Sequence, residues 1–178
     1  MPLKDLLAEY ARRHPGETAT ADRFAELLES RPDCFSRSCV PAHLTASAWI
    51  VDPARRHVML THHRKLGRWL QPGGHCDGDP HTLGVAIRET LEETGLTVDP
   101  VSEAIFDLDI HRIPARGVDP GHWHYDVRFA LQARHTHYVV SSESHDLAWV
   151  PMGRLQEWSR EPSLHRMARK WFAIEADG

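Results

Sequence analysis

Residues 88–96 read Arg-Glu-Thr-Leu-Glu-Glu-Thr-Gly-Leu, and this stretch decides the fold. The spacing of its glutamates is i, i+3 and i+4, so one face of a helix presents the carboxylates of Glu89, Glu92 and Glu93. Three like charges this close repel one another, and hard divalent cations with oxygen ligands offset that repulsion. A solvated acidic face is the alternative. The opposite face is expected to be buried, because at about 100° per residue it presents Leu83, Ile87 and Leu91.

The loop before this helix has the composition of a phosphate-binding turn. Residues 73–79 read Gly-Gly-His-Cys-Asp-Gly-Asp. A glycine pair lets the backbone approach a ligand closely, and backbone N–H groups in such a turn cradle phosphate. The helix is expected to run from about Asp79 to Thr94, because Gly95 is a strong C-terminal stop signal. Loop and helix together suit a phosphate substrate bridged by a metal ion.

At these residues the chain resembles the Nudix hydrolase family. The family's box reads Gly, five residues, Glu, seven residues, then Arg-Glu-apolar-any-Glu-Glu-any-Gly-apolar. Pro80 stands where the box has its first Glu, and Thr90 where an apolar residue is usual. Pro80 fits the first turn of a helix, and Asp77 or Asp79 is expected to replace the missing carboxylate as partner of Arg88. The matching positions are Gly74, Arg88, Glu89, Glu92, Glu93, Gly95 and Leu96.

The resemblance implies metal-dependent hydrolysis of a diphosphate linked to another moiety, with a nucleotide as the expected substrate. It assigns Mg²⁺ or Mn²⁺ to the carboxylates of Glu89, Glu92 and Glu93 and to the backbone carbonyl of Gly74. Glu92 or Glu93 is the alternative candidate for orienting the attacking water, and Glu143, in a Ser-rich loop, is a further candidate base. Such an ion polarises a phosphoryl oxygen and lowers the pKa of bound water, and a carboxylate takes the proton.

Basic and imidazole side chains near the loop are candidate substrate contacts. Arg64 and Arg68 precede the glycine pair and are placed to meet a phosphate, with a solvated basic turn as the equal alternative. His75 follows the glycine pair and is a second phosphate candidate, although a bond to a neighbouring carbonyl explains it as well. His124 completes this set of substrate candidates.

Alternating polar residues on a later strand form a possible second site. His122, His124 and Asp126 share one face of an expected strand, and His111 on the preceding strand is placed to meet them. This set is a candidate lining of the substrate pocket or a transition-metal site, with an ordinary polar sheet surface as the alternative. It also supports a rival function, a histidine-based metal-binding protein. Another rival is a non-catalytic nucleotide sensor, which the intact glutamate set argues against.

The mixture of expected strands with a few helices favours an α+β or an α/β sandwich. The Nudix resemblance implies an α/β fold, an α/β/α sandwich with a mixed sheet, in which residues 1–40 are expected to form an N-terminal helical extension and residues 41–178 the Nudix hydrolase domain. Thr20 or Asp22 is the expected cap of the second helix. The expected strands lie at 45–51, 57–61, 101–113, 123–133 and 146–150, and the expected helices within 2–33 and at 79–94, 151–159 and 162–175.

The chain has 178 residues, 26% of them charged, and a formal charge of −4, which is ordinary globular composition without a nucleic-acid signal. It lacks an apolar run of about 20 residues, so we expect no membrane span, and its N-terminus lacks a signal-peptide pattern. Its cysteines, Cys34, Cys39 and Cys76, are too few and odd in number for a disulfide framework. These features predict a cytoplasmic protein and leave an oligomer possible, and the Nudix resemblance implies a small-molecule phosphate substrate as its partner.

Overall fold

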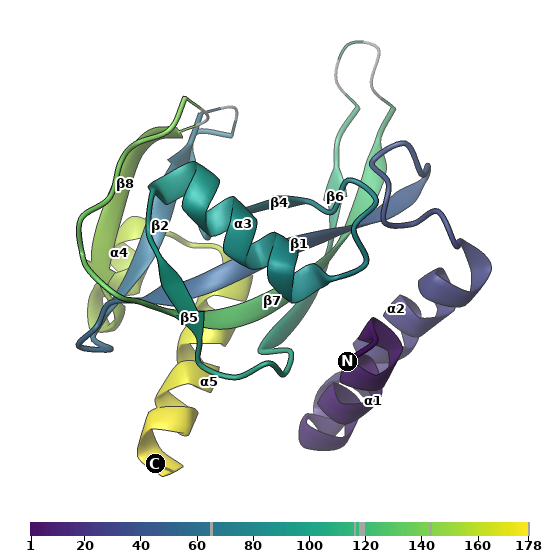
Figure 1. Cartoon of the computed structure of the whole chain (residues 1–178), viewed down its shortest axis with the longest axis horizontal. Helices are drawn as coiled ribbons and strands as arrows, with labels where there is room; N and C mark the ends of the chain where they lie inside the picture. Colours follow the sequence, from purple (N-terminus) through teal and green to yellow (C-terminus); the bar gives the residue numbers. More distant parts are fainter. Residues whose placement is uncertain (65, 116, 118–119, 143, 178) are drawn as a thin grey trace. The chain divides into compact units, whose positions relative to one another are not determined.

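The computed structural model describes residues 1–64, 66–115, 117, 120–142 and 144–177 (Figure 1). The helices are α1 Leu3–Arg13, η1 Pro15–Glu17, α2 Thr18–Ser30, α3 Thr82–Thr94, η2 Met152–Arg154, α4 Leu155–Trp158 and α5 Pro162–Asp177. The strands are β1 Ala42–Val51, β2 His57–His63, β3 Arg68–Leu70, β4 Gly73–His75, β5 Val98–Pro100, β6 Asp107–Ile113, β7 His122–Ala133 and β8 Ser144–Pro151. None of the described helices combines the length and apolarity needed to cross a membrane.

The strands form one sheet, in the hydrogen-bonded order β3-β2-β1-β7-β5, with β4 pairing with β1, β6 with β7 and β8 with β2. The predicted α/β class is therefore confirmed. Some element predictions were wrong. Residues 101–106 turn instead of extending β6, and the three-residue strands β3, β4 and β5 were not among the expected strands. A three-residue strand carries too little periodicity to be detected in sequence.

The chain divides into two compact units, and the long elements β1, β7 and α3 contribute residues to both. Unit 1 comprises Met1–Ser47, Gly74–Ala86 and Glu103–Phe129. Unit 2 comprises Ala48–Gly73, Ile87–Ser102 and Ala130–Gly178.

In unit 1 the two N-terminal helices are amphipathic and pack through their apolar faces. The ring of Phe24 on α2 meets Tyr125 of β7 edge-on, with centroids 5.1 Å apart. The guanidinium of Arg13 donates to the carbonyl of Ile105 at 2.9 Å. The prediction that Thr20 or Asp22 caps α2 was wrong, because α2 begins at Thr18 and no side chain caps it. The buried apolar residues of the pair are Leu3, Leu6, Leu7, Tyr10, Ala21, Phe24 and Leu27.

In unit 2 the strand β2 pairs antiparallel with three strands, β1, β3 and β8. It pairs with β8 from His57↔Pro151 to His63↔Ser144, and with β3 from Thr61↔Leu70 to His63↔Arg68. The turn that enters β2 is organised by Asp52, whose carboxylate accepts hydrogen bonds from the amides of Arg56 at 2.7 Å and His57 at 3.0 Å.

Helix α3 begins three residues later than predicted, at Thr82, so Pro80 precedes it instead of lying in its first turn. It ends where predicted, because Gly95 adopts a φ of +70° that disfavours other residues. The predicted burial of its aliphatic face was wrong. Leu91 is 55% exposed, whereas Thr90 and Glu93 are buried. The helix therefore buries polar atoms that must find hydrogen-bond partners.

Candidate functional site

The three glutamates of α3 differ in how deeply they are buried. Glu93 is 9% exposed, the Glu89 side chain is 14% exposed, and the Glu92 side chain is 61% exposed. All three lie in unit 2, within a little more than one turn of helix. Glu93 is therefore the most buried carboxylate of the three, and Glu92 is the one that reaches solvent.

Glu93 is anchored by the strand that precedes the helix. Its Oε1 accepts a hydrogen bond from the backbone N–H of Gly73 at 3.0 Å. A carboxylate that accepts a backbone N–H is held in one orientation, and that orientation suits a metal ligand better than a freely rotating side chain does. Gly74, whose carbonyl is the fourth member of the predicted metal-ligand set, follows Gly73 directly in the chain.

Arg88 does contact carboxylates, and the described ones belong to its own helix. Its Nη2 donates to Glu89 Oε1 at 2.8 Å, and its Nε lies 3.8 Å from Glu92 Oε1. The two aspartates predicted to hold it have other described partners. Asp77 accepts from the guanidinium of Arg37 through both oxygens at 2.6 Å, and Asp79 accepts from the backbone N–H of His81 at 2.8 Å.

This donor set fits a hard divalent cation. Three carboxylates with one arginine beside them leave an excess of two negative charges on one helix face. Oxygen ligands of this kind are those that Mg²⁺ and Mn²⁺ prefer. The structure does not show which ion binds, so the assignment of Glu89, Glu92, Glu93 and Gly74 to a metal stays a prediction.

The predicted phosphate contacts before the glycine pair are exposed basic side chains. Arg64 donates to the carbonyl of Ser144 at 3.1 Å, and Arg68 pairs with Glu161. Arg64 and Arg68 are both exposed residues of unit 2, so each guanidinium is accessible to an anion. Their substrate role stays a prediction. Glu143, the predicted candidate base in the Ser-rich loop, lies outside the described residues.

The histidines form a second cluster, in unit 1. His111 lies directly opposite His124 in the β6–β7 register, as predicted, with ring centroids 5.4 Å apart. Nε2 of His122 lies 3.2 Å from Nε2 of His124. Asp126, predicted on the same face, is buried and accepts from Arg128 and from the hydroxyl of Ser47. The strand pattern therefore placed this face correctly.

Two members of the cluster come from other strands. His43 of β1 and His75 of β4 join His124, with ring centroids 4.8 Å apart for His43–His124 and 5.2 Å for His75–His124. The sequence pattern did not identify His43, and it gave His75 as a phosphate contact or as a loop histidine bonded to a neighbouring carbonyl. The available signal was the alternation of His43, Thr45 and Ser47 along an otherwise apolar strand.

Burial favours the neutral form of three of these imidazoles. Together with neighbouring basic groups, it lowers the pKa of His75 to about 4 and that of His124 to about 2. Burial also lowers the pKa of His43. At neutral pH these imidazoles carry no charge, and each keeps one lone-pair nitrogen. The predicted substrate contacts of His75 and His124 stay predictions.

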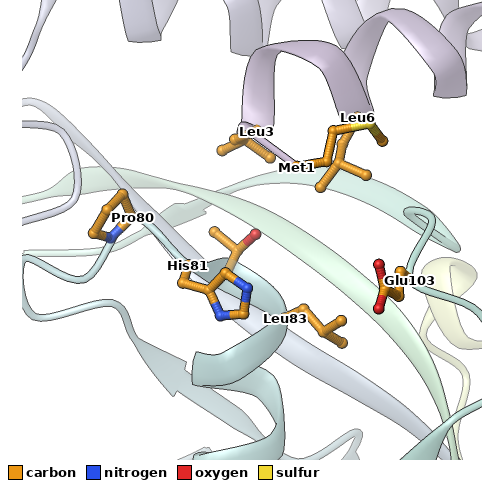
Figure 2. Close-up of a pocket in the computed structure, with 8 residues that line it drawn as sticks. Met1, Leu3, Leu6, Pro80, His81, Leu83 and Glu103 are labelled. Atoms are coloured by element: carbon orange, nitrogen blue, oxygen red, sulfur yellow. The ribbon is translucent and has the colours of Figure 1, made fainter.

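A separate small pocket lies in unit 1, where the N-terminal segment meets the start of α3 (Figure 2). Its volume is about 100 Å³, well below the roughly 300–1,000 Å³ of a cofactor or ligand site. It is too small for a nucleotide, so we place no substrate there. Its lining consists of Met1, Leu3, Leu6, Pro80, His81, Thr82, Leu83 and Glu103.

Comparison with known families identifies the domain in which these two clusters lie. A model of the NUDIX domain matches residues 41–172, about three quarters of the chain. The chain belongs to the Nudix family. The matched region contains the whole box, from Gly74 to Leu96, and all five clustered histidines.

Individual Nudix relatives are distant. The "Putative 8-oxo-dGTP diphosphatase 3" of Mycobacterium tuberculosis is 28% identical over 114 residues, which cover 60% of this chain and 50% of that protein. The chain thus spans about half the length of the curated relatives it matches.

Solved structures agree on the fold. A NUDIX-family hydrolase from Clostridium perfringens is 25% identical, with a TM-score of 0.58 over 74% of this chain and 97% of that one. A C. elegans Ap4A hydrolase in a binary complex is 18% identical, with a TM-score of 0.57 over 76% of this chain and 98% of that one. The second likeness supports the Nudix fold alone.

Proposed function

We propose that this chain is a Nudix pyrophosphohydrolase that cleaves a phosphoric anhydride bond in a nucleoside diphosphate-linked substrate. One observation supports this most. The three glutamates of the box share one face of α3, and Glu93 is fixed there by the amide of Gly73. Nudix hydrolases generally use divalent cations, and we propose Mg²⁺ or Mn²⁺ for this chain because its donors are carboxylate oxygens.

We assign metal binding to Glu89 and Glu93, the two less exposed carboxylates, with Glu92 and the carbonyl of Gly74 completing the set. The bound ion would polarise a phosphoryl oxygen and neutralise charge on the diphosphate. Arg88 keeps Glu89 oriented through the 2.8 Å contact. Arg64 and Arg68 are proposed to hold the outer phosphate, since a guanidinium offers a planar fork of donors to a phosphate.

Glu92 is the better candidate of the two helix residues for taking the proton of the attacking water. Its side chain is 61% exposed and so can reach a water molecule, whereas Glu93 is engaged with Gly73. A base must lie within hydrogen-bond reach of the proton that it removes. Glu143 stays a competing proposal.

A nucleotide substrate is the proposed class because the M. tuberculosis relative is named for 8-oxo-dGTP and the C. elegans structure for Ap4A. Three thiols that are buried and form no disulfide, Cys34, Cys39 and Cys76, support the proposal of a reducing, cytoplasmic compartment.

The test is a hydrolysis assay on chelator-treated protein. Substrates are nucleoside triphosphates, dinucleoside polyphosphates and sugar nucleotides, each assayed with Mg²⁺ and with Mn²⁺. We expect activity only with an added ion. Glu92→Gln and Glu93→Gln should each lower kcat by roughly 10²-fold or more, because each removes a ligand or a base. Titrating the metal separates the two roles, since excess ion restores part of the rate only where a ligand was lost.

Glu26→Gln is the matched control, because Glu26 is an exposed glutamate on α2 and the same charge is removed without touching α3. Wild-type kcat in both helix variants, or full activity in excess chelator, rejects the proposed mechanism.

A further inference from the structure

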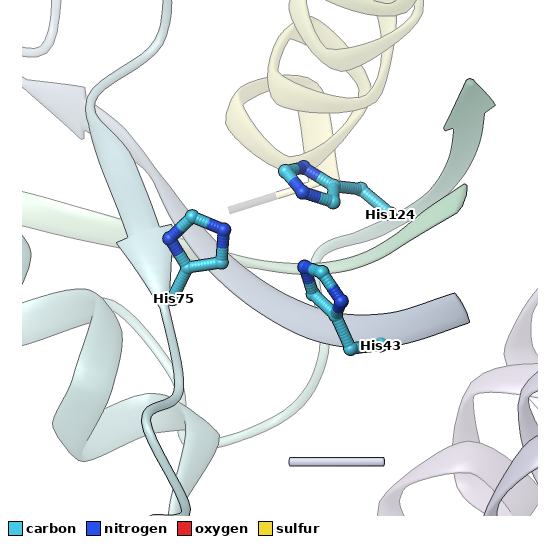
Figure 3. A group of neighbouring side chains, drawn as sticks. All are labelled: His43, His75 and His124. Atoms are coloured by element: carbon cyan, nitrogen blue, oxygen red, sulfur yellow. The ribbon is translucent and has the colours of Figure 1, made fainter. Parts of the chain in front are cut away.

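Three imidazoles from three different strands converge in unit 1. Figure 3 shows His43 of β1, His75 of β4 and His124 of β7 with their rings turned toward a common space. One ring nitrogen from each lies within 4.8 Å of the other two. A tetrahedral zinc site with Zn–N bonds of about 2.0–2.1 Å places its nitrogens about 3.3–3.4 Å apart. Modest side-chain rotations therefore convert this arrangement into a ligand set.

His43 is already prepared as a ligand. It is 2% exposed, and its Nδ1 lies 3.2 Å from the carbonyl of Cys39, so Nδ1 carries the proton and donates it. Its Nε2 is then a bare lone pair, and it is buried without a hydrogen-bond partner among the described residues. Burying such a nitrogen costs stability unless something binds it. A ring whose second nitrogen donates to a backbone carbonyl is typical of metal-binding histidines.

A hydrogen bond from His124 to His122 fixes the tautomer of the His124 ring. Nδ1 of His122 lies 3.0 Å from the carbonyl of Pro120, which assigns the proton to Nδ1 and leaves Nε2 as an acceptor. That Nε2 lies 3.2 Å from Nε2 of His124, so His124 donates there and keeps its Nδ1 lone pair. The network fixes one ring tautomer and leaves a metal-binding nitrogen on His124.

We propose that His43, His75 and His124 form a binding site for a divalent transition-metal ion of the zinc type, separate from the carboxylate set of α3. Imidazole nitrogen suits Zn²⁺, Cu²⁺, Fe²⁺ and Ni²⁺, whereas Mg²⁺ and Mn²⁺ prefer oxygen. Three protein ligands leave a fourth position open for water or an anionic ligand, as in sites that bind a reactant.

This ligand set differs from the one that the strand pattern alone suggests. His111, across from His124, has its Nδ1 3.1 Å from Asp109 and lies outside the converging group. His122 contacts His124 through the nitrogen that accepts. The structure therefore assigns His122 a supporting position beside His124 and places His111 outside the set, with His43 and His75 joining His124 as the ligands.

The experiment measures zinc binding by the chelator-treated full chain, with Mg²⁺ in excess throughout. Competition with a chromophoric chelator should give about one equivalent of Zn²⁺, and Co²⁺ should give the visible ligand-field bands of a nitrogen-rich site. His75→Ala and His124→Ala should each weaken zinc binding roughly 10²-fold or more, because even outer-shell losses cost 10–100-fold. Zinc should also raise the Tm of the wild type but not of these variants.

Two controls keep the outcome clear. His137→Ala removes an exposed histidine outside the cluster and should bind zinc as the wild type does. His111→Ala distinguishes the two possible ligand sets and should keep its affinity within a few-fold. His43→Gln is a third ligand variant, read only where circular dichroism shows a wild-type fold. The proposal is overturned if the wild type fails to bind stoichiometric zinc. It is also overturned if His75→Ala and His124→Ala bind zinc with the affinity of the wild type.

Discussion

Arg128 carries its charge in the interior of unit 1, where only a surrounding set of carboxylates makes it tolerable. Its Nε donates to Asp126 at 2.7 Å, and its Nη1 and Nη2 lie 3.3 Å from Asp107 and Asp109. Burial alone would lower the pKa of Arg128, but these three carboxylates raise it. The hydroxyl of Ser47 donates a further hydrogen bond to the buried carboxylate of Asp126.

Replacing this residue tests how much the network contributes. Arg128→Met should lower the free energy of unfolding by about 3–5 kcal/mol, because it leaves buried carboxylates without their cation. Arg134→Met is the control, since Arg134 pairs with Asp99 at the surface and its loss should hardly change the unfolding midpoint. Chemical denaturation measures both. A change in Arg128→Met no larger than in the control would show that the buried charges are solvated in another way.

At this scale the sequence predicts local chemistry better than long-range contacts. The spacing of Glu89, Glu92 and Glu93 identified the acidic helix face, since i, i+3 and i+4 is a local rule. The contact between Glu93 and the Gly73 amide was not predictable, because it depends on how a strand meets a helix twenty positions later. His43 was missed for the same reason, since strand pairing brings it to His124.

At the level of elements, α3 shows where the helical pattern misleads. The sequence places aliphatic side chains opposite the acids, yet Leu91 is exposed while Thr90 and Thr94 are fully buried. Thr94 can be buried because its hydroxyl donates to the carbonyl of Thr90 at 2.6 Å. Periodicity indicates that a helix has two faces. It does not show that the buried face of α3 contains Glu93 and a threonine whose hydroxyl donates to the helix backbone.

The turn between β1 and β2 depends on one carboxylate. Burial alone would raise the pKa of Asp52, but hydrogen bonds from the His57 and Arg56 amides and the His57 ring outweigh burial, and the pKa lies below its usual value of 3.8. A folded pKa below the unfolded one means that the ionised group stabilises the protein above pH 3.8. This contribution is lost as the pH falls through the folded pKa.

Asp52→Asn should therefore lower the free energy of unfolding by about 1–3 kcal/mol at neutral pH, because it weakens charge-assisted hydrogen bonds. The difference from the wild type should shrink in acid, as the pH falls from 3.8 through the folded pKa. Denaturation curves at several pH values measure it. Asp22→Asn, at an exposed aspartate of α2, should show no such pH dependence. A difference that stays constant into acid would assign the effect of Asp52→Asn to turn geometry and not to its charge.

At the scale of the whole molecule, the Nudix match begins at residue 41, and the two N-terminal helices precede it. They nevertheless belong to the same compact unit as β6 and most of β7. Phe24 meets Tyr125 edge-on, and the guanidinium of Arg23 lies 5.8 Å from the centroid of the same ring. The sequence predicted a helical extension at residues 1–40. Its helices pack into the core of unit 1, although the matched Nudix region begins only at residue 41.

Phe24 is the residue through which this idea is best tested. It is fully buried, so Phe24→Ala should lower the free energy of unfolding by about 3–5 kcal/mol through lost burial and the cavity left behind. Phe172→Ala is the matched control, because Phe172 on α5 is 51% exposed and should cost little. A chain limited to residues 41–178 should have a lower Tm and bind a hydrophobic dye, since it uncovers Tyr125 and its neighbours. If the shortened chain keeps the Tm of the full chain, the helices are an independent appendage and their contact with β7 contributes nothing to the fold.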